Sequence, residues 1–461
     1  MTAQEEEEEE TIDPRIWKVC AVVILGPLMA QMDTTVVNVS LSTIRQDLGA
    51  TINSAHWIVG GYLLALALTL PLNAWLVDRL GAKRLYLTCF TAFTLTSALC
   101  GMATTMGGLI AARALQGAAG GLLTPMAQMM MARVAGKHLA RLIGYAAVPV
   151  LLAPIFGPSL AGAVLKYAAW PWLFYINLPI GVLAIALAAG LLPRDEQLER
   201  KRALDFNGLL LISPGLAAFL YGLDHFPEIS GVAAVALGLA LLGAFIRYAL
   251  QRGETALIDV RLFKIRIFSV ATATQCLSNA ATFAGQMLVP LFLIGGCGLT
   301  PTRAAWVLAP MGLGMLVMFP SMGFLTGRFG CRTVAAGGAL MTAVSTLPIL
   351  WMAQAGQVPL VLMALCMLLR GAGQGATGVP TLAAGYASVP KPQLPLATTA
   401  TNIAQRVGGP IGTTVLALVI SSSAAGLPAP SPAAFTAAFV VLLALHLGVF
   451  GLAACLPDRL P

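Results

Sequence analysis

Charged side chains are scarce in this sequence. Only 10% of its 461 residues are Asp, Glu, Lys or Arg, whereas soluble domains carry about 25% charged residues. A soluble chain of this length divides into domains that each need a polar surface. The composition therefore excludes an ordinary soluble protein.

The residue patterns of several common functional sites are also missing. The eight cysteines form no CxxC pair and the four histidines are scattered, so the sequence indicates no metal site and no histidine relay. It has no Walker loop, no HExxH and no paired intramembrane carboxylates, which argues against an ATP-driven pump or a membrane-embedded enzyme. We therefore expect no enzyme activity, no metal and no cofactor.

Long apolar segments fill the chain instead. Hydrophobic residues make up 58% of it, and apolar runs of about 20 residues, long enough to cross a bilayer as a helix, recur from end to end. This pattern predicts an all-α polytopic membrane protein embedded in the lipid bilayer. Fourteen transmembrane helices are expected near 17–41, 54–77, 84–104, 108–132, 140–165, 173–193, 207–225, 231–250, 267–294, 302–325, 332–353, 358–385, 396–423 and 433–456.

Basic residues occur mainly in every second loop of this fourteen-helix arrangement. Of the 27 Lys and Arg residues, 21 fall on the side of the N-terminus, and only Arg45, Lys166 and Arg303 fall in loops on the opposite side. Cytoplasmic loops of membrane proteins are enriched in this way. The pattern predicts a membrane protein with both termini in the cytoplasm, and it explains the net charge of +8 without a nucleic-acid partner.

Two sequence patterns occur twice. AWLVDRLGAKR (74–84) is similar to GFLTGRFGCR (323–332), and ARALQGAAGG (112–121) is similar to LRGAGQGATG (369–378). The offsets, 249 positions (79 to 328) and 257 positions (113 to 370), are close, so we expect duplicated halves with a substrate site between them. The predicted division is 1–16 acidic disordered cytoplasmic tail, 17–193 N-terminal six-helix bundle, 194–266 linker with two extra transmembrane helices, 267–456 C-terminal six-helix bundle, and 457–461 cytoplasmic tail.

Six segments in this order resemble the major facilitator superfamily, and specifically its fourteen-helix drug:proton antiporters of the EmrB/QacA type. The resemblance covers about residues 17–456. Some positions depart from the family pattern. Ala74, Ala153 and Ala161 replace glycines of the motifs, and Ala82 replaces a basic residue. Pro171 stands where the family usually has Arg. The segments are MDTTVVNVSLSTI (32–44), AWLVDRLGAKR (74–84), RALQGAAGG (113–121), APIFGPSLAG (153–162), WPWLFYINLPIG (170–181) and TNIAQRVGGPIG (401–412).

Asp33 is the one carboxylate expected deep in the membrane. A charged side chain at the centre of a spanning helix costs about 2.5–3.5 kcal/mol on insertion scales, so it needs a reason to be there. A buried carboxylate that loads and releases a proton could couple transport to the proton gradient. The alternative is a purely structural ion pair or a backbone cap.

Arg113 is the expected partner of Asp33. Counted from the outer ends of their helices, the two residues differ in depth by about 4–5 Å at 1.5 Å per residue, which an arginine can span. The family resemblance likewise implies that this arginine influences proton transfer. A structural arginine that binds backbone carbonyls is the alternative.

Two motifs are expected to support a conformational cycle. The cytoplasmic turn formed by Asp78, Arg79, Gly81, Lys83 and Arg84 is predicted to act as a latch that stabilises the outward-facing state, with the aspartate accepting from the N-terminus of a neighbouring helix. In the fifth helix, the resemblance implies an antiporter kink, in which proline removes a helix hydrogen bond and glycines permit close packing. The kink residues are Gly157, Pro158 and Gly162.

The remaining polar residues in the expected spans are candidates to line a substrate cavity. Four methionines in MAQMMMAR (126–133) could adapt to varied ligands or fill lipid-facing positions. The sequence thus predicts a proton-driven exporter of small amphiphilic or lipophilic compounds, with a monomer as the expected form. Export of an anionic metabolite or siderophore, and a non-transporting sensor, are the alternatives. The candidate cavity residues are Gln31, Thr34, Asn38, Gln116, Arg370, Asn402 and Arg406.

Overall fold

The structure is a computed structural model that describes residues 12–195, 203–355, 358–423 and 431–458, and the regular elements in these ranges are all helices. Threonine and serine side chains begin several of them, as Thr105 does by accepting from the amide of Gly108 at 3.2 Å. The N-terminal half contains α2 (Pro14–Val23), α3 (Leu25–Asp47), α4 (Ile52–Thr69), α5 (Asn73–Leu80), α6 (Ala82–Gly101), α7 (Met106–Ala135), α8 (Leu139–Tyr167), α9 (Trp172–Tyr175) and α10 (Asn177–Leu191).

The second part of the chain begins with a helical hairpin of α11 (Phe206–Asp224) and α12 (Ile229–Arg252). Short 3-10 turns at 70–72, 136–138, 253–255, 260–264 and 391–393, and a π-helical turn at 292–296, connect or extend the longer helices. The C-terminal half contains α13 (Arg266–Leu291), α14 (Pro301–Leu308), α15 (Pro310–Ala355), α16 (Leu360–Ala387), α17 (Leu394–Ser423) and α18 (Pro432–Ala453).

The class of the fold is confirmed, but the count of fourteen spans is not. Within the described ranges, ten helical stretches are long and apolar enough to cross a membrane, or up to eleven if the bent pair 106–154 and 156–167 forms one span. One stretch, Pro301–Ala355, has 55 residues, more than twice the length that a bilayer requires. The count is lower because Pro301–Ala355 contains two of the predicted segments, the bent pair 106–154 and 156–167 contains two more, and α6, which holds the predicted segment 84–104, is not among these stretches.

Gly330 interrupts that long stretch and reproduces a feature of the N-terminal half. Its φ of 79° and the φ of 84° at Gly81 both lie in the left-handed region, where glycine has no steric penalty. These are the two glycines of the repeated basic turns. The backbone therefore supports the duplication inferred from the sequence.

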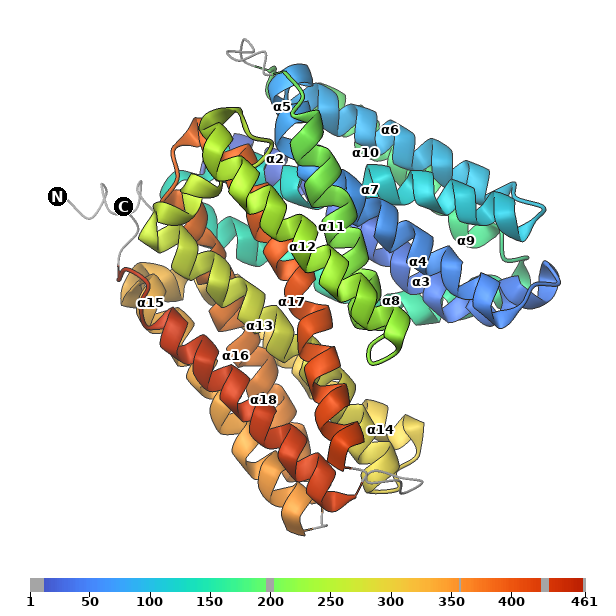
Figure 1. The fold of residues 1–461 in the computed structure, drawn as a ribbon, viewed down its shortest axis with the longest axis vertical. Coiled ribbons are helices and arrows are strands. Elements are labelled where there is room, and N and C mark those ends of the chain that lie inside the picture. The colour runs from blue at the N-terminus through green and yellow to red at the C-terminus, as the bar shows by residue number, and fades with distance from the viewer. Residues whose placement is uncertain (1–11, 196–202, 356–357, 424–430, 459–461) are drawn as a thin grey trace.

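The two halves form arms that diverge from a common end. Figure 1 shows α9 and α14 at separate ends of the arms, and the described chain begins and ends at the side opposite to them. The hairpin lies beside both halves, because α11 contacts α4 as well as α17. The predicted tail 1–16 lies largely outside the described residues, as do parts of the predicted linker and C-terminal tail; α2 already begins at Pro14.

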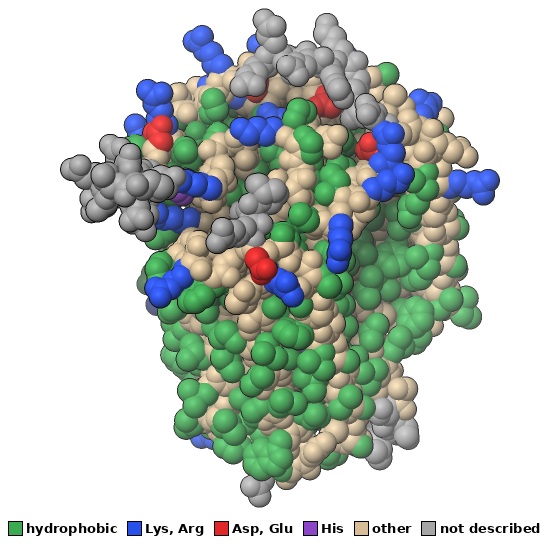
Figure 2. Space-filling view, turned by 90° about the vertical axis from the view of Figure 1, so that its left-hand side faces the viewer, with side chains coloured by type: hydrophobic (Ala, Val, Ile, Leu, Met, Phe, Trp, Pro, Cys, Tyr) green, Lys and Arg blue, Asp and Glu red, His purple; other side chains and the backbone are tan. Residues whose placement is uncertain are grey.

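The surface has the polarity of a membrane protein. In Figure 2, Lys and Arg side chains gather around one end, and hydrophobic side chains cover the flank beneath them. Exposed large apolar residues on this chain include Leu313, Val317 and Phe324 of α15, which are 57%, 70% and 64% exposed. Such a continuous apolar flank would be costly in water and is suited to lipid.

Candidate functional site

Asp33 lies inside the N-terminal half and is hydrogen-bonded from three sides. Its carboxylate accepts from Arg113 Nη1 at 2.5 Å, from Gln116 Nε2 at 3.0 Å and from Asn177 Nδ2 at 2.9 Å. Only 2% of Asp33 is exposed. All three partners donate hydrogen bonds to Asp33, and an ionised carboxylate can only accept them, so the surroundings match that form. The contact between Asp33 and Arg113 agrees with the depths predicted for the two residues.

Arg113 is enclosed by aromatic and polar groups. Its guanidinium lies 4.3 Å from the ring centroid of Tyr62 and 5.9 Å from that of Phe174. It also donates to the Ile58 carbonyl at 3.3 Å and to Gln116 Oε1 at 2.7 Å. Aromatic faces stabilise a desolvated cation, so this arrangement helps to hold the arginine against Asp33.

The glycines of the fourth-helix motif explain how α4 comes so close to this arginine. A Cβ at Gly117 would lie 2.9 Å from the backbone carbonyl carbon and the Cα of Tyr62, closer than ordinary contacts allow. Glycine therefore permits α4 and α7 to pack backbone to backbone. This contact places the Tyr62 ring over Arg113.

Asn177 belongs to the site but was not among the predicted site residues. It is the first residue of α10, where it donates to Asp33 and, at 3.0 Å, to Ser97 Oγ of α6. One feature of the sequence could have identified it: Asn177 is a single amide side chain at the start of an otherwise apolar helix, inside the segment WPWLFYINLPIG. Asn177 ties α10 and α6 to the carboxylate.

Asp33 and Asn177 also form the polar end of an apolar cavity. The cavity measures about 340 Å³ and lies between α3, α8 and α10. Ligand pockets for small molecules typically start at about this size and are mostly apolar with a few polar groups. The other lining residues are apolar: Leu28, Met29, Met32, Val36, Pro149, Leu152, Ala153, Phe156, Leu160, Leu173, Ile176 and Ile180.

Three predicted cavity residues on α3 do not line this space. Gln31 and Asn38 are exposed, and the Thr34 hydroxyl donates to the Ala30 carbonyl of the same helix at 2.8 Å. They lie on a different face of α3 from Asp33. Gln116, by contrast, lies within the hydrogen-bond network of Asp33.

The predicted cavity residues of the C-terminal half lie in separate places. Asn402 joins the two halves by donating to Gln128 Oε1 at 2.7 Å. Arg370 is 1% exposed and binds the Ala281 carbonyl at 3.3 Å. Arg406 is partly buried, with its Nε lacking a partner among the described residues. The structure therefore does not assemble the predicted residues around one described cavity.

Polar side chains connect the halves near the basic end. Gln128 of α7 accepts from Tyr386 at 2.8 Å as well as from Asn402, and Asn73 donates to Thr399 Oγ1 at 3.0 Å. These contacts close the space between the halves at this end, whereas the arms separate at the other end (Figure 1).

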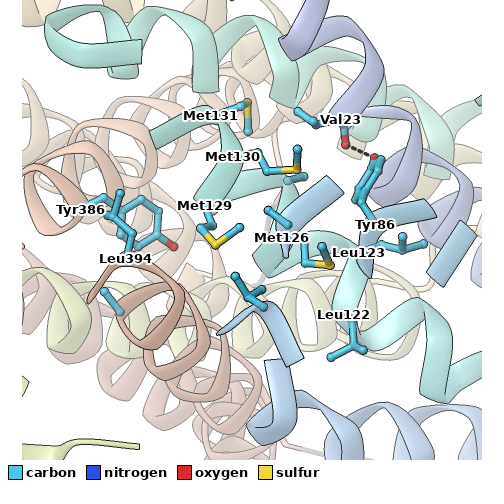
Figure 3. Packing of buried hydrophobic residues seen from close by; sticks show 14 of the residues in the cluster. Val23, Tyr86, Leu122, Leu123, Met126, Met129, Met130, Met131, Tyr386 and Leu394 are labelled. Carbon is cyan, nitrogen blue, oxygen red and sulfur yellow. Dashed lines mark hydrogen bonds between the residues drawn. The ribbon is translucent and has the colours of Figure 1, made fainter. Parts of the chain in front are cut away.

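The methionines of α7 belong to this closed region. Met126, Met129, Met130 and Met131 are between 0% and 5% exposed, so the lipid-facing alternative is wrong for them. Figure 3 shows the Met129 side chain on the side of Tyr386 and Leu394 from the C-terminal half. Flexible thioethers can maintain packing when neighbouring surfaces shift.

The basic turn at Gly81 has a partner that the sequence did not reveal. Asp195, which follows α10, accepts from the backbone amides of Lys83 at 2.8 Å and Arg84 at 3.2 Å at the N-terminus of α6. Lys83 Nζ in turn donates to the carbonyls of Ala189 and Leu192 at 2.7 and 2.8 Å. The carboxylate that accepts from the N-terminus of α6 is therefore Asp195, which was not among the predicted latch residues.

The other residues of the turn have different surroundings. The Arg79 guanidinium lies 5.5 Å from the Trp75 ring centroid, and Arg84 takes part through its backbone amide. On the following basic turn, burial and then the charges of Lys137 and Arg141 lower the pKa of His138. That histidine is thus held neutral at physiological pH beside two cations.

Replacing Asp195 by Ala is expected to lower the free energy of unfolding by about 1 kcal/mol, the usual value of a carboxylate that caps a helix N-terminus. The loss should appear as a lower Tm of the purified protein. Arg194→Ala, at the exposed neighbouring residue, is the matched control. Equal Tm values for the two variants would show that the Asp195 contacts contribute nothing.

The predicted kink residues of α8 differ in their packing. Gly157 lies against Thr35 of α3, with an ideal Cβ only 2.7 Å from the Thr35 methyl group, so it permits close approach of the two helices. Pro158 is one of three prolines inside α8, and each removes a backbone donor. Gly162 is exposed and an added Cβ would meet no atom within 4 Å. The expectation that Gly162 brings backbones together is therefore wrong.

Comparisons with known proteins are consistent with this architecture. The family model described as Major Facilitator Superfamily matches residues 23–413. A "Multidrug resistance protein B homolog" from Mycobacterium tuberculosis is 34% identical over 421 residues, which cover 89% of this chain and 77% of the relative. A "Putative multidrug resistance protein MdtD" from Cronobacter sakazakii is 32% identical and covers 73% and 72%, respectively.

Solved structures with low sequence identity share the fold. The crystal structure of the human organic anion transporter MFSD10 superposes with a TM-score of 0.67 at 16% identity, covering 96% of this chain and all of that one. The proton:xylose symporter XylE, bound to 6-bromo-6-deoxy-D-glucose, gives a TM-score of 0.64 at 14% identity, covering 96% of each chain.

Proposed function

The chain belongs to the major facilitator superfamily, and from this premise we propose that it exports small amphiphilic compounds in exchange for protons. Its relatives carry multidrug-resistance names, which supports drug-like substrates. The proposed location is a bacterial inner membrane with both termini in the cytoplasm. The proton gradient supplies the energy, so no cofactor takes part.

The observation that carries this proposal is the carboxylate of Asp33 at the polar end of an apolar cavity. Asp33 pairs with Arg113 on one side and faces a cavity large enough for a small substrate on the other. The carboxylate can therefore respond to two ligands, a proton and an amphiphile. Protonation would weaken the pair with Arg113, and deprotonation would restore it. The carboxylate is thus a candidate switch between proton and substrate.

Alternating access would use the two halves as moving bodies, with 17–193 and 267–456 as the proposed units. If both termini are cytoplasmic, the polar contacts between the halves lie at the cytoplasmic end and the two arms diverge toward the outside (Figure 1). Opening inward would separate Gln128 from Tyr386 and Asn402 and expose the Met129 region. Neutral polar pairs and methionines are suited to contacts that must form and break repeatedly.

Inside-out vesicles with an acidic lumen test the proposal. Adding a substrate should release protons from the lumen as the substrate enters, and a pH-sensitive dye inside the vesicles reports this. Monovalent cationic or neutral amphiphiles should give larger signals than dications, because Asp33 is a single acid that Arg113 already compensates. Equal responses to monovalent dyes and dicationic biguanides would contradict the charge preference. Substrate uptake with no proton release would contradict antiport.

Export of an anionic metabolite or siderophore is the second candidate function. It is favoured by Arg370 and Arg406, two cationic side chains within the predicted spans of the C-terminal half. The same vesicle assay separates the two candidates. One-for-one exchange of a monovalent cation for a proton moves no net charge, whereas exchange of an anion for a proton moves net charge and therefore responds to the membrane potential. The alternative of a non-transporting sensor has no structural observation in its favour.

A further inference from the structure

The cavity beside Asp33 is formed by the N-terminal half alone. All of its lining residues lie between Leu28 and Ile180, and they come from α3, α8, α9, α10 and the residue that joins the last two helices. On α8 the lining runs from Pro149 to Leu160, about 16 Å at a rise of 1.5 Å per residue. The cavity is therefore long, and it is separate from the space between the two halves.

The cavity lies away from the polar face of α3. Gln31 and Asn38 are exposed and lie seven residues apart, so both are on the same side of a helix with 3.6 residues per turn. Val36, which lines the cavity, is five residues beyond Gln31 and therefore about 140° around the helix. The helix itself thus separates the cavity from water that reaches its polar face.

The cavity has its opening where apolar side chains are exposed. Phe156 of α8 and Ile180 of α10 line the cavity and are 58% and 36% exposed. Leu183, one turn beyond Ile180, is 57% exposed. Apolar side chains exposed on the flank of a membrane protein contact lipid. The cavity therefore opens between α8 and α10 toward the hydrocarbon of the bilayer.

Hydrocarbon suits this space better than water does. Asp33 and Asn177 are its polar lining residues, and Asn177 donates to Asp33 and to Ser97. A buried water molecule needs about two to four polar partners, whereas the rest of this lining is apolar. An aliphatic chain needs no polar partner, and it supplies the contacts that the lining of an empty cavity lacks.

We infer that an acyl chain of a membrane phospholipid enters between α8 and α10 and occupies this cavity when no substrate is bound. The chain completes the apolar surroundings of the Asp33 network on the side that the protein leaves open. The head group stays at the membrane surface, so the cavity recognises the chain and not the head. The inference rests on the proposed function in one respect, because a substrate that uses the same space must displace the chain.

Photolabelling of the full-length protein in lipid vesicles tests the inference. The vesicles contain phosphatidylethanolamine, phosphatidylglycerol and a small fraction of a phosphatidylcholine whose acyl chain carries a diazirine. After illumination, mass spectrometry locates the labelled residues. We expect label on Met29 and Ala153, which line the cavity and are each 1% exposed, so that lipid on the outer surface cannot reach them. Label on the exposed Leu237 of α12 but on neither of these two residues would overturn the inference.

Two matched pairs of variants test the site and the route. Ala153→Phe fills the cavity, whereas Ala163→Phe adds the same side chain at an exposed position of the same helix. Ile180→Trp narrows the opening, and Leu183→Trp is its control one turn away. Label on Met29 should be lost in the first member of each pair and kept in the controls, while label on α12 stays the same. Undiminished label on Met29 in a folded Ala153→Phe would refute binding in the cavity, and undiminished label in Ile180→Trp would refute entry between α8 and α10.

Addition of a transported dye separates this inference from the proposed function. A monovalent dye that causes proton release in the vesicle assay should remove the label from Met29 if it uses the same cavity. Label that persists during transport supports the lipid site and places the substrate elsewhere. Label on Met29 in a protein that transports nothing also supports the lipid site and contradicts only the proposed function.

Discussion

Asp33→Asn is expected to insert and fold normally but to lose export driven by a pH gradient. The substitution keeps the size of the side chain and an oxygen that can accept from Gln116 and Asn177. It removes the charge, and with it a membrane-insertion cost of about 2.5–3.5 kcal/mol. The guanidinium of Arg113 keeps the Ile58 carbonyl, Gln116 Oε1 and the Tyr62 ring as partners, which offsets the loss of its counter-ion. The substitution also removes the proton-dependent pairing with Arg113. The rate of uphill export should therefore fall to background at a wild-type level of protein.

Asp47→Asn is the control for this variant. Asp47 is the last residue of the same helix, α3, and accepts from Trp170 Nε1 at 2.6 Å. It lies away from the Arg113 network, so its substitution should leave pH-driven export active. The measurement is substrate accumulation in inside-out vesicles with an imposed pH gradient. Uphill export at the wild-type rate by Asp33→Asn would make the carboxylate structural and refute its coupling role.

Arg113→Ala is expected to have the largest effect on stability. Removal of one partner from a buried ion pair typically costs about 3–5 kcal/mol, because it leaves an uncompensated charge. In this molecule it also empties the space under the Tyr62 ring. Arg113→Lys should be less damaging, since the positive charge remains although the forked donor geometry is lost. Tm and pH-driven export should both follow the order wild type, lysine, alanine.

The double variant Arg113→Ala with Asp33→Asn separates the pair from the surrounding packing. If the uncompensated carboxylate causes the loss, the double variant should be more stable than Arg113→Ala alone, giving a coupling energy from the mutant cycle. Additive effects would mean that the two residues stabilise the fold independently. Such additivity would also remove the basis for a switch formed by this pair.

The sequence alone was sufficient to identify the class of the protein and its most unusual charged pair. Low charge content and repeated apolar runs require a lipid environment whatever the tertiary packing, so the membrane class followed from composition. The contact of Asp33 with Arg113 could be predicted because depth along a helix depends only on residue number. Duplication could be read from the repeated turns, since the glycine in each needs the same left-handed backbone conformation.

Only the tertiary structure decided which faces and which distant residues meet. Asn177 reaches Asp33 across 144 positions, and Asp195 reaches Lys83 across 112. The rotation of a helix about its axis and the choice of its neighbours depend on packing against helices far away in the sequence. For that reason the exposure of Gly162 and the burial of the α7 methionines could not be predicted from local pattern.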